Sequence, residues 1–230
     1  MKKVPDFEND KIVMVCIDMQ NQYGGEGRFL SWAAWEWDAV AKNANKVLVA
    51  CRERGYPIVH VRVARDPDGI MCHPYDERDE NGKPIYSVKG TWEADFIDYM
   101  KPLPGELVVE KQRFSAFYQT NFELILDGLK AEHLIMVGCD TDSCFLTSIY
   151  DAFTRGYTTS VVKDAVTSCT EGEHKASMLT IANWIYGGSI FEADEMVKAI
   201  KGKEYKAWFW ETSHSFPFQT NNIDELYAQI

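Results

Sequence analysis

Short apolar runs alternate with amphipathic stretches along most of the chain. Residues 11–19 (KIVMVCIDM) are apolar almost without interruption, which predicts a strand buried on both faces of a sheet. In residues 34–55 the apolar positions recur three and four apart, and Gly55 follows the last of them, so this stretch predicts a helix. A second apolar run at 57–64 completes a strand–helix–strand unit.

The same alternation continues through the rest of the main body of the chain. We expect further strands at 105–111, 133–138 and 157–164, helices at 92–100, 120–131, 147–156 and 172–187, and a short strand and a helix within 188–200. A polar loop rich in Asp, Gly and Pro separates two of these elements at residues 65–92. Such an order of elements predicts an α/β protein with three layers, an α/β/α sandwich around a mostly parallel sheet.

The C-terminal segment breaks this pattern. Residues 206–218 (KAWFWETSHSFPF) are dense in aromatic side chains and show no clear period. We therefore expect one main domain at 1–204 and an aromatic tail at 205–230, which packs on the domain or on a neighbouring subunit. Because exposed apolar surface of this density marks an interface, we also expect a homo-oligomer.

Composition narrows the class of protein. The 230 residues are 46% hydrophobic, which suits a single globular domain, and the net charge of −11 with no basic patch argues against nucleic acid or an anionic membrane as a partner. No apolar run is long enough to span a bilayer or to serve as a signal peptide. The six cysteines include no CxxC pair, so we expect reduced thiols and a cytoplasmic protein.

Three chemically active side chains stand where predicted strands end. Asp18 ends the first strand, Lys111 ends the third, and the turn after the fourth leads to Cys144. Because ligands of open parallel sheets bind beyond the carboxyl ends of the strands, these three side chains are expected to meet. The start of a helix and the charge of Lys111 are both expected to lower the pKa of the Cys144 thiol. Asp18 would accept the thiol proton and later activate water.

Taken singly, each of these residues has a simpler explanation. A lone cysteine is more often a packed thiol, Asp18 could form a turn, and Lys111 could be a solvated surface residue. In the turn before Cys144, we expect at least one of Thr141, Asp142 and Ser143 to cap the following helix. Among the remaining cysteines, Cys16, Cys51 and Cys169 are expected in the core.

Four stretches together resemble the isochorismatase-like cysteine hydrolases, a family that includes nicotinamidase and several carbamoyl and ureido amidohydrolases. The stretches are CIDMQNQY at 16–23, EKQRFSAFYQT at 110–120, GCDTDSCFLTS at 138–148 and VVKDAVTS at 161–168. Each lies at or near the end of a predicted strand, and the resemblance extends over residues 10–200, within the expected hydrolase domain.

The resemblance implies a fold and a site. The fold would be an α/β sandwich around a six-stranded parallel sheet, and many members of the family are tetramers. The family's catalytic triad would fall on Asp18, Lys111 and Cys144. The backbone N–H groups of Asp140 and Cys144 would form the oxyanion hole, beside a cis peptide bond between Cys139 and Asp140.

The resemblance also bears on metal and on substrate. Nicotinamidases carry an Asp-x-His element, whereas the corresponding region here offers His73 without that spacing, so we expect no metal and no other cofactor. Residues 89–117 are similar to the biuret and peroxyureidoacrylate type of enzyme. The expected substrate is therefore a small amide, carbamoyl or ureido compound, in a pocket walled by Tyr23, Trp92 and Phe117 unless these aromatic residues belong to the core.

Other functions remain open at this point. The chain could be a non-catalytic binding member of the family, or a nicotinamidase-type hydrolase. A redox enzyme that uses Cys139 or Cys144 is a further alternative, although such enzymes usually carry a CxxC pair.

Overall fold

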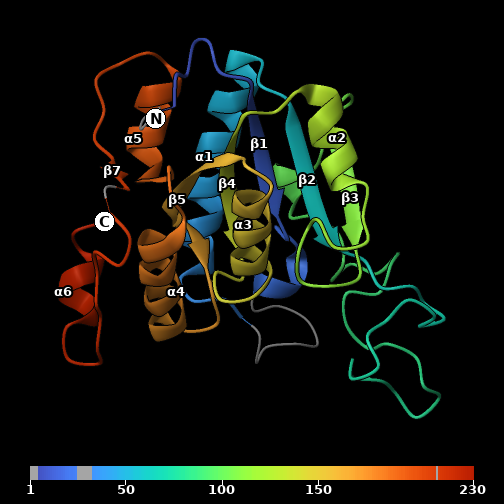
Figure 1. Cartoon of the computed structure of the whole chain (residues 1–230). Coiled ribbons are helices and arrows are strands. Elements are labelled where there is room, and N and C mark those ends of the chain that lie inside the picture. The colour runs from blue at the N-terminus through green and yellow to red at the C-terminus, as the bar shows by residue number, and fades with distance from the viewer. Residues whose placement is uncertain (1–4, 25–32, 211) are drawn as a thin grey trace.

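The computed structural model describes residues 5–24, 33–210 and 212–230 and shows a central sheet with helices on both faces (Figure 1). The strands are β1 (Ile12–Ile17), β2 (Ile58–Val63), β3 (Leu107–Lys111), β4 (His133–Cys139), β5 (Thr158–Thr167), β6 (Ser189–Phe191) and β7 (Trp208–Phe209). The helices are α1 (Trp37–Arg54), α2 (Phe122–Leu129), α3 (Cys144–Thr154), α4 (Glu171–Trp184), α5 (Ala193–Ile200) and α6 (Ile223–Tyr227), with 3₁₀ turns at Asn21–Gly24 and Asp98–Met100.

The predicted α/β/α sandwich is confirmed. The strand order is β3-β2-β1-β4-β5-β6-β7, and all neighbours run parallel except β6 and β7. The sheet therefore has seven strands rather than six, because the C-terminal segment adds β7 as an antiparallel edge strand. Among the described residues, every helix is too short or too polar to cross a lipid bilayer.

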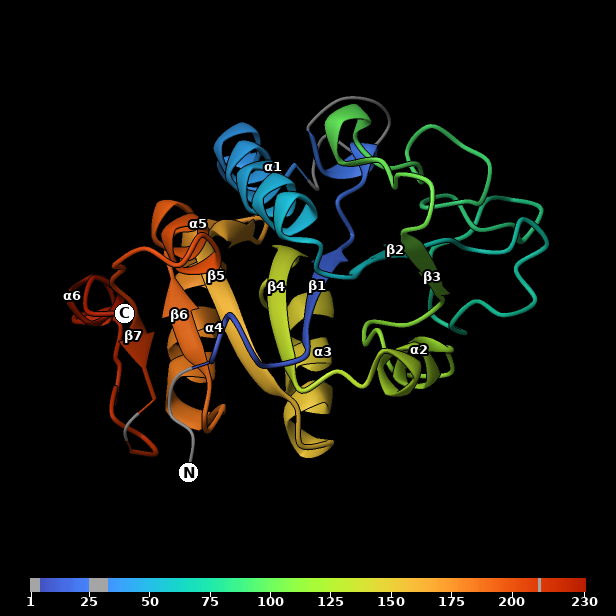
Figure 2. The ribbon, with the colours of Figure 1, turned by 90° about the horizontal axis from the view of Figure 1, so that it is seen from above.

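Two apolar cores hold the layers together. On one face, Met14 and Cys16 of β1 pack with α1 and α5, and on the other, Val13 and Val15 pack with α2, α3 and α4. Figure 2 shows this division, with α1 and α5 on one side of the strands and α3 and α4 on the other. Alternate side chains of a strand point to opposite faces, which explains why the central strands read as continuous apolar runs.

One predicted helix is wrong. Residues 92–100 form turns and a single 3₁₀ turn, because their backbone bonds to the end of β1 instead of to itself. The N–H of Ile97 donates to the carbonyl of Met19, and the side-chain amide of Gln20 donates to the carbonyl of Ala94 at 2.8 Å. This segment is thereby fixed beside the end of β1, next to the predicted site.

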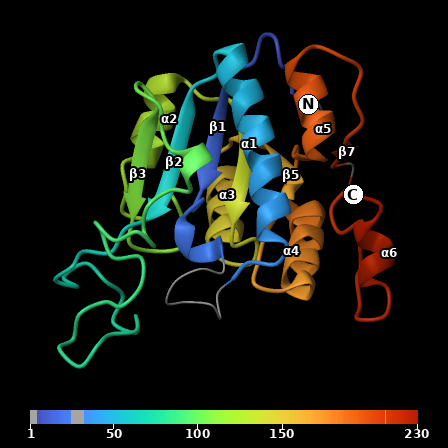
Figure 3. The same cartoon turned by 180° about the vertical axis from the view of Figure 1, so that it is seen from behind.

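The tail packs on its own domain. Phe216 is buried, and the side chain of Asn183 in α4 both donates to its carbonyl at 2.9 Å and accepts from its N–H at 2.8 Å. Tyr227 of α6 lies against α4 through His174. The loop at 65–92, in contrast, extends beyond the carboxyl ends of β2 and β3, away from the body of the molecule (Figure 3).

Candidate active site

Asp18, Lys111 and Cys144 meet at the carboxyl edge of the sheet. The Nζ atom of Lys111 lies 2.8 Å from Oδ2 of Asp18 and 3.0 Å from Sγ of Cys144. The three side chains come from the ends of β1 and β3 and from the first residue of α3, and all three are buried. The ammonium group of Lys111 thus joins Asp18 and Cys144, which are 126 positions apart in the sequence, as the strand ends predicted.

The backbone around the cluster is closely fitted. Asp18 has a φ of 52°, in the left-handed region, and its N–H donates to the carbonyl of Val61 in β2 at 2.8 Å. Gly138, with a φ of 129°, lies so close to β1 that a Cβ atom there would come within 1.9 Å of the Ile17 carbonyl oxygen. Only glycine fits that position. Because glycine has no side chain, β4 can lie close to β1, and the turn that leads to Cys144 lies directly beside Asp18.

The turn between β4 and α3 has a defined geometry. The peptide bond between Cys139 and Asp140 is cis, as the resemblance implied. The N–H of Thr141 donates to the carbonyl of Thr167 at 2.8 Å, and the Thr141 hydroxyl lies 3.0 Å from Nδ1 of His174. The turn is therefore tied to both β5 and α4.

The expected side-chain cap of α3 is wrong. Ser143 is the N-cap residue, but its side chain makes no capping hydrogen bond. Asp142 instead accepts from the hydroxyl of Ser168 at 2.7 Å, and Thr141 is engaged with His174. The prediction that Cys169 is a core residue is wrong as well, because its side chain is exposed.

Burial dominates the ionisation of the Cys144 thiol. Desolvation raises the pKa of Cys144 to about 12, although the neighbouring Lys111 ammonium lowers it. The sequence had predicted a lowered pKa, since burial cannot be read from a motif. Burial also acts to lower the pKa of Lys111, but the Asp18 carboxylate and the Cys144 thiol outweigh it and hold that pKa above its usual value. At neutral pH the cluster thus holds a charged lysine and a protonated thiol.

A cavity of about 480 Å³ opens beside Cys144, a size that suits a small ligand. Of the three aromatic residues expected in its wall, Tyr23 lines the cavity. Phe117 instead packs in the core against Phe122, with ring centroids 4.7 Å apart, and Trp92 is half exposed outside the cavity wall. The path of the loops, which no periodic pattern encodes, decides which aromatic residues reach the cavity.

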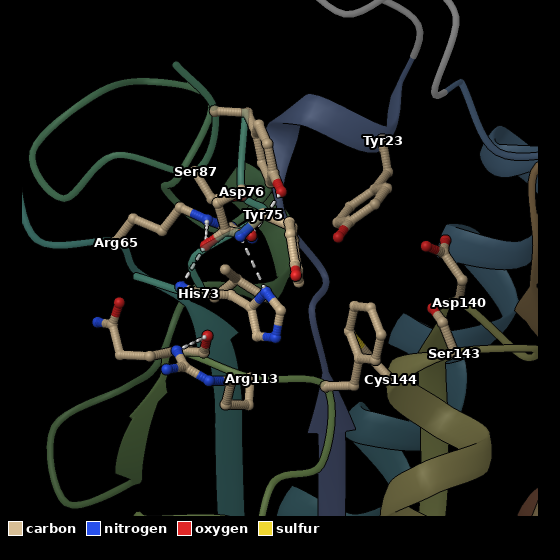
Figure 4. Close-up of a pocket in the computed structure, with 14 residues that line it drawn as sticks. Tyr23, Arg65, His73, Tyr75, Asp76, Ser87, Arg113, Asp140, Ser143 and Cys144 are labelled. Carbon is tan, nitrogen blue, oxygen red and sulfur yellow. Dashed lines mark hydrogen bonds and ion pairs between the residues drawn. The ribbon is translucent and has the colours of Figure 1, made fainter. Parts of the chain in front are cut away.

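Much of the cavity wall comes from the loop at 65–92. Arg65 stacks on the ring of Tyr86 at 3.8 Å and pairs with Asp76 at 3.2 Å, while His73 and Tyr75 face the cavity beside them (Figure 4). Sequence reasoning assigned no site role to these residues. The only signal was their place in a long polar loop next to the strand ends.

Arg113 closes the cavity on the side of β3. Its Nη1 atom donates to the carbonyl of Met71 at 2.7 Å, so it also ties β3 to the loop. No group of three or more His, Cys, Asp or Glu side chains that could hold a metal ion occurs within residues 5–24, 33–210 and 212–230. Nδ1 of His73 accepts from the backbone N–H of Tyr75 at 3.2 Å, and the backbone N–H of His73 donates to Oδ2 of Asp76 at 2.9 Å.

The family is shown by comparison with known proteins. Residues 13–194 match the model of the isochorismatase domain. The chain belongs to the isochorismatase family. The ureidoacrylate amidohydrolase RutB of Rhizobium rhizogenes is 30% identical over 66% of this chain and 68% of its own length. The same enzyme of Methylorubrum extorquens AM1 is 27% identical over 81% of this chain and 84% of its own length.

Solved structures of this family share the fold. An isochorismatase family protein from Desulfovibrio vulgaris superposes with a TM-score of 0.74 at 24% identity, over 84% of this chain and 100% of its own. The N-carbamoylsarcosine amidase of Thermoplasma acidophilum superposes with a TM-score of 0.65 at 28% identity, over 80% of this chain and 98% of its own.

Proposed function

We propose that the protein is a cysteine-dependent amidohydrolase that cleaves a C–N bond of a small amide, carbamoyl or ureido compound. The observation that carries the proposal is the Lys111 ammonium, which lies between the Asp18 carboxylate and the Cys144 thiol beside a cavity of suitable size. A carboxylate, an ammonium and a thiol in contact supply the base, the charge stabilisation and the nucleophile that amide hydrolysis needs.

The first half-reaction forms a thioester. Because burial keeps the Cys144 thiol protonated, a base must remove its proton as sulfur attacks the carbonyl carbon, and Asp18 is the carboxylate in the cluster. The C–N bond then breaks, and the leaving nitrogen takes the proton from Asp18 and departs as ammonia or an amine. Lys111 stays charged throughout and offsets the negative charge that passes between oxygen and sulfur.

The second half-reaction releases the acid. Asp18 removes a proton from water, the water oxygen attacks the thioester carbonyl, and the C–S bond breaks with return of the proton to Cys144. In both steps the carbonyl oxygen becomes an oxyanion. We propose that the backbone N–H groups of Asp140 and Cys144 bind it, a kind of interaction that typically lowers a barrier by ~3 kcal/mol for each donor.

The relatives support this choice of reaction and substrate class. Ureidoacrylate amidohydrolase and N-carbamoylsarcosine amidase are named for the hydrolysis of ureido and carbamoyl compounds. All six cysteines of this chain are free, which is typical of the reducing cytoplasm, where we propose that the enzyme acts.

A screen for ammonia release over small amides, carbamoyl compounds and ureides tests the proposal. We expect turnover of at least one compound, its loss in Cys144→Ala, and its survival in Cys169→Ala, which removes an exposed thiol instead. Turnover should also survive dialysis against EDTA, which separates this enzyme from a metal-dependent nicotinamidase. Binding without ammonia release would identify a non-catalytic member, and equal activity of Cys144→Ala would remove the thiol from the reaction.

A further inference from the structure

One oxygen of the Asp140 carboxyl group stands out in the wall of the cavity. Asp140 lines the cavity, and Figure 4 shows its side chain on the same side as Tyr23, next to Ser143 and Cys144. Its Oδ1 atom is buried and has no hydrogen-bond partner in the described part of the chain. Buried polar atoms almost always have a partner, so an acceptor left without one in the wall of a cavity points to a ligand that supplies the donor.

The neighbouring Asp142 shows what a structural carboxylate in this turn looks like. Its Oδ1 accepts from the Ser168 hydroxyl at 2.7 Å, and its N–H donates to the same hydroxyl at 3.2 Å. Asp142 does not line the cavity. Two aspartates of one short turn thus differ in environment: the protein supplies a donor to Oδ1 of Asp142, whereas Oδ1 of Asp140 stays buried without one in the described part of the chain.

The surroundings of Asp140 make it a strong acceptor. Burial and the nearby carboxylates of Asp18 and Asp142 raise its pKa to about 7, against the opposing influence of Lys111 and the Ser143 hydroxyl. It is therefore ionised in mildly basic solution. A second buried oxygen, Oδ1 of Asp18, also lacks a hydrogen-bond donor among the residues that the structure describes. Two aspartates close to Cys144 thus have a buried oxygen that lacks a donor within the described chain, which favours a ligand rich in N–H groups.

The chemistry of the substrate class fits this surplus. A ureido group carries N–H bonds on both sides of the carbonyl, whereas a simple amide carries them on one side only. When the backbone N–H groups of Asp140 and Cys144 hold the carbonyl oxygen of a ureido compound, the N–H groups of that compound lie in the same small part of the cavity. Because the backbone of Asp140 helps to hold this oxygen, the side chain of the same residue lies close to the reacting group.

We propose that the Asp140 carboxylate accepts a hydrogen bond from the N–H next to the carbamoyl group and so makes the site selective for ureido compounds over simple amides. The inference rests on the proposed hydrolase function and names its substrate class. In this role Asp140 is a specificity residue whose side chain acts separately from its backbone N–H.

Matched substrate pairs test the role of this one N–H. Biuret and malonamide differ only by an NH and a CH₂, as do 3-ureidopropionate and glutaramate. The ratio of kcat/KM within each pair, at pH 8 where the carboxyl is ionised, is measured for the wild type, Asp140→Asn and the control Asp142→Asn. A hydrogen bond to a charged group typically corresponds to a difference of about ten- to hundredfold.

We expect the wild type and Asp142→Asn to favour the ureido member of at least one pair by about this factor. Asp140→Asn should lose most of this preference, because kcat/KM falls more for the ureido member than for the amide member. An equal loss for both members of each pair, or a wild type that hydrolyses amides but no ureide, would overturn the inference and leave the hydrolase function intact. Absence of all turnover would contradict the proposed function itself.

A binding measurement distinguishes a failure of the role proposed for Asp140 from a failure of the proposed hydrolase function. Titration calorimetry on Cys144→Ala measures the affinity for biuret and malonamide without any reaction. The ureido compound should bind about tenfold or more tightly to Cys144→Ala, and the advantage should disappear in Cys144→Ala/Asp140→Asn. Equal affinities in the first variant would overturn the role of Asp140, whatever the activity of the enzyme.

Discussion

At the scale of single residues, Lys111 holds the site together. Its side chain is wholly buried, and an unpaired ammonium in such a place would lose its proton. Asp18 prevents this loss at a distance of 2.8 Å, and the same ammonium contacts Cys144 at 3.0 Å. The three groups therefore form one electrostatic unit, and a change in one alters the protonation of the other two.

Asp18→Asn tests this unit. Asparagine keeps the shape of the side chain but cannot act as a base, so we expect turnover to fall by about two to four orders of magnitude. Because Lys111 would lose its counter-charge, the free energy of unfolding should also fall, by roughly 3 kcal/mol. Both kcat and the unfolding midpoint are measured on the same preparation, and kcat is corrected for the folded fraction.

Mass spectrometry adds a second measurement to the same variant. If deacylation needs the base more than acylation does, a thioester adduct on Cys144 accumulates and is visible as added mass. A variant with near-normal kcat in its folded fraction would show that Asp18 only shapes the turn after β1.

The sequence predicted these three residues but not their protonation states. Asp18, Lys111 and Cys144 could be found because each stands at the end of an apolar run within a recognisable motif. The pKa of Cys144 could not, because it depends on how completely the folded chain excludes water. Trp92 and Phe117 were misplaced for a related reason, since side chains near a site reach it only if the loops turn that way.

At the scale of elements, α4 connects the C-terminal segment to the turn before Cys144. His174 of α4 lies 3.0 Å from the Thr141 hydroxyl and 2.9 Å from the Tyr227 hydroxyl. Thr141 follows Asp140 directly, so α6 is linked to the proposed oxyanion hole through two hydrogen bonds. The sequence predicted α4 from its apolar spacing, but β7 and α6 are too short for a period to emerge. Residues 92–100 depart from their helical pattern because Phe96 forms an antiparallel bridge with Gln20, just after β1.

His174 should make stability depend on pH. Burial, together with the charges of Lys175 and Lys163, lowers its pKa from about 6.5 to about 4. Between about pH 6.5 and pH 4, His174 is therefore protonated in the unfolded chain but neutral in the folded protein. Its contribution to stability is complete above pH 6.5 and is lost as the pH falls through this window, by about 3 kcal/mol in total.

The measurement compares urea unfolding at pH 7.5 and pH 5 for the wild type and His174→Gln. Glutamine can still hydrogen-bond to Thr141 and Tyr227 but does not titrate, so the variant should lose clearly less stability between the two pH values. An identical loss in both proteins would assign the acid sensitivity to other groups, of which buried His60, whose pKa is also lowered, is the first candidate.

At the scale of the whole molecule, the site lies between the edge of the central sheet and the loop at 65–92. The sheet ends supply Asp18, Lys111 and Cys144, while the loop at 65–92 supplies the opposite wall of the cavity. The alternation of apolar and polar stretches predicted the body because each element buries a periodic face. It could not predict the loop, whose form rests on individual contacts such as the pair between Arg65 and Asp76.

The same loop changes the expected location of a subunit interface. The aromatic side chains of the tail are at most partly exposed, since Phe216 is buried and Trp208 packs beside it with ring centroids 5.7 Å apart. Large exposed apolar side chains instead occur on the loop and just after β3, at Ile70, Met71, Tyr75, Phe114 and Tyr118. Two of these side chains, Tyr75 and Phe114, line the cavity, and exposed apolar surface of this kind is typical of an interface.

We therefore predict a homo-oligomer, with a tetramer favoured, whose contacts include the loop at 65–92. Light scattering at micromolar protein should give a mass close to four times the 26.3 kDa of one chain. Ile70 is 81% exposed and Met71 is 55% exposed, so the double variant Ile70→Ser/Met71→Ser removes apolar surface without disturbing a core. This double variant should have a lower mass in solution. Leu124→Ser, on α2 and 74% exposed, is the control that should leave it unchanged. A wild type of monomeric mass would contradict the prediction, and a double variant of unchanged mass would place the interface elsewhere.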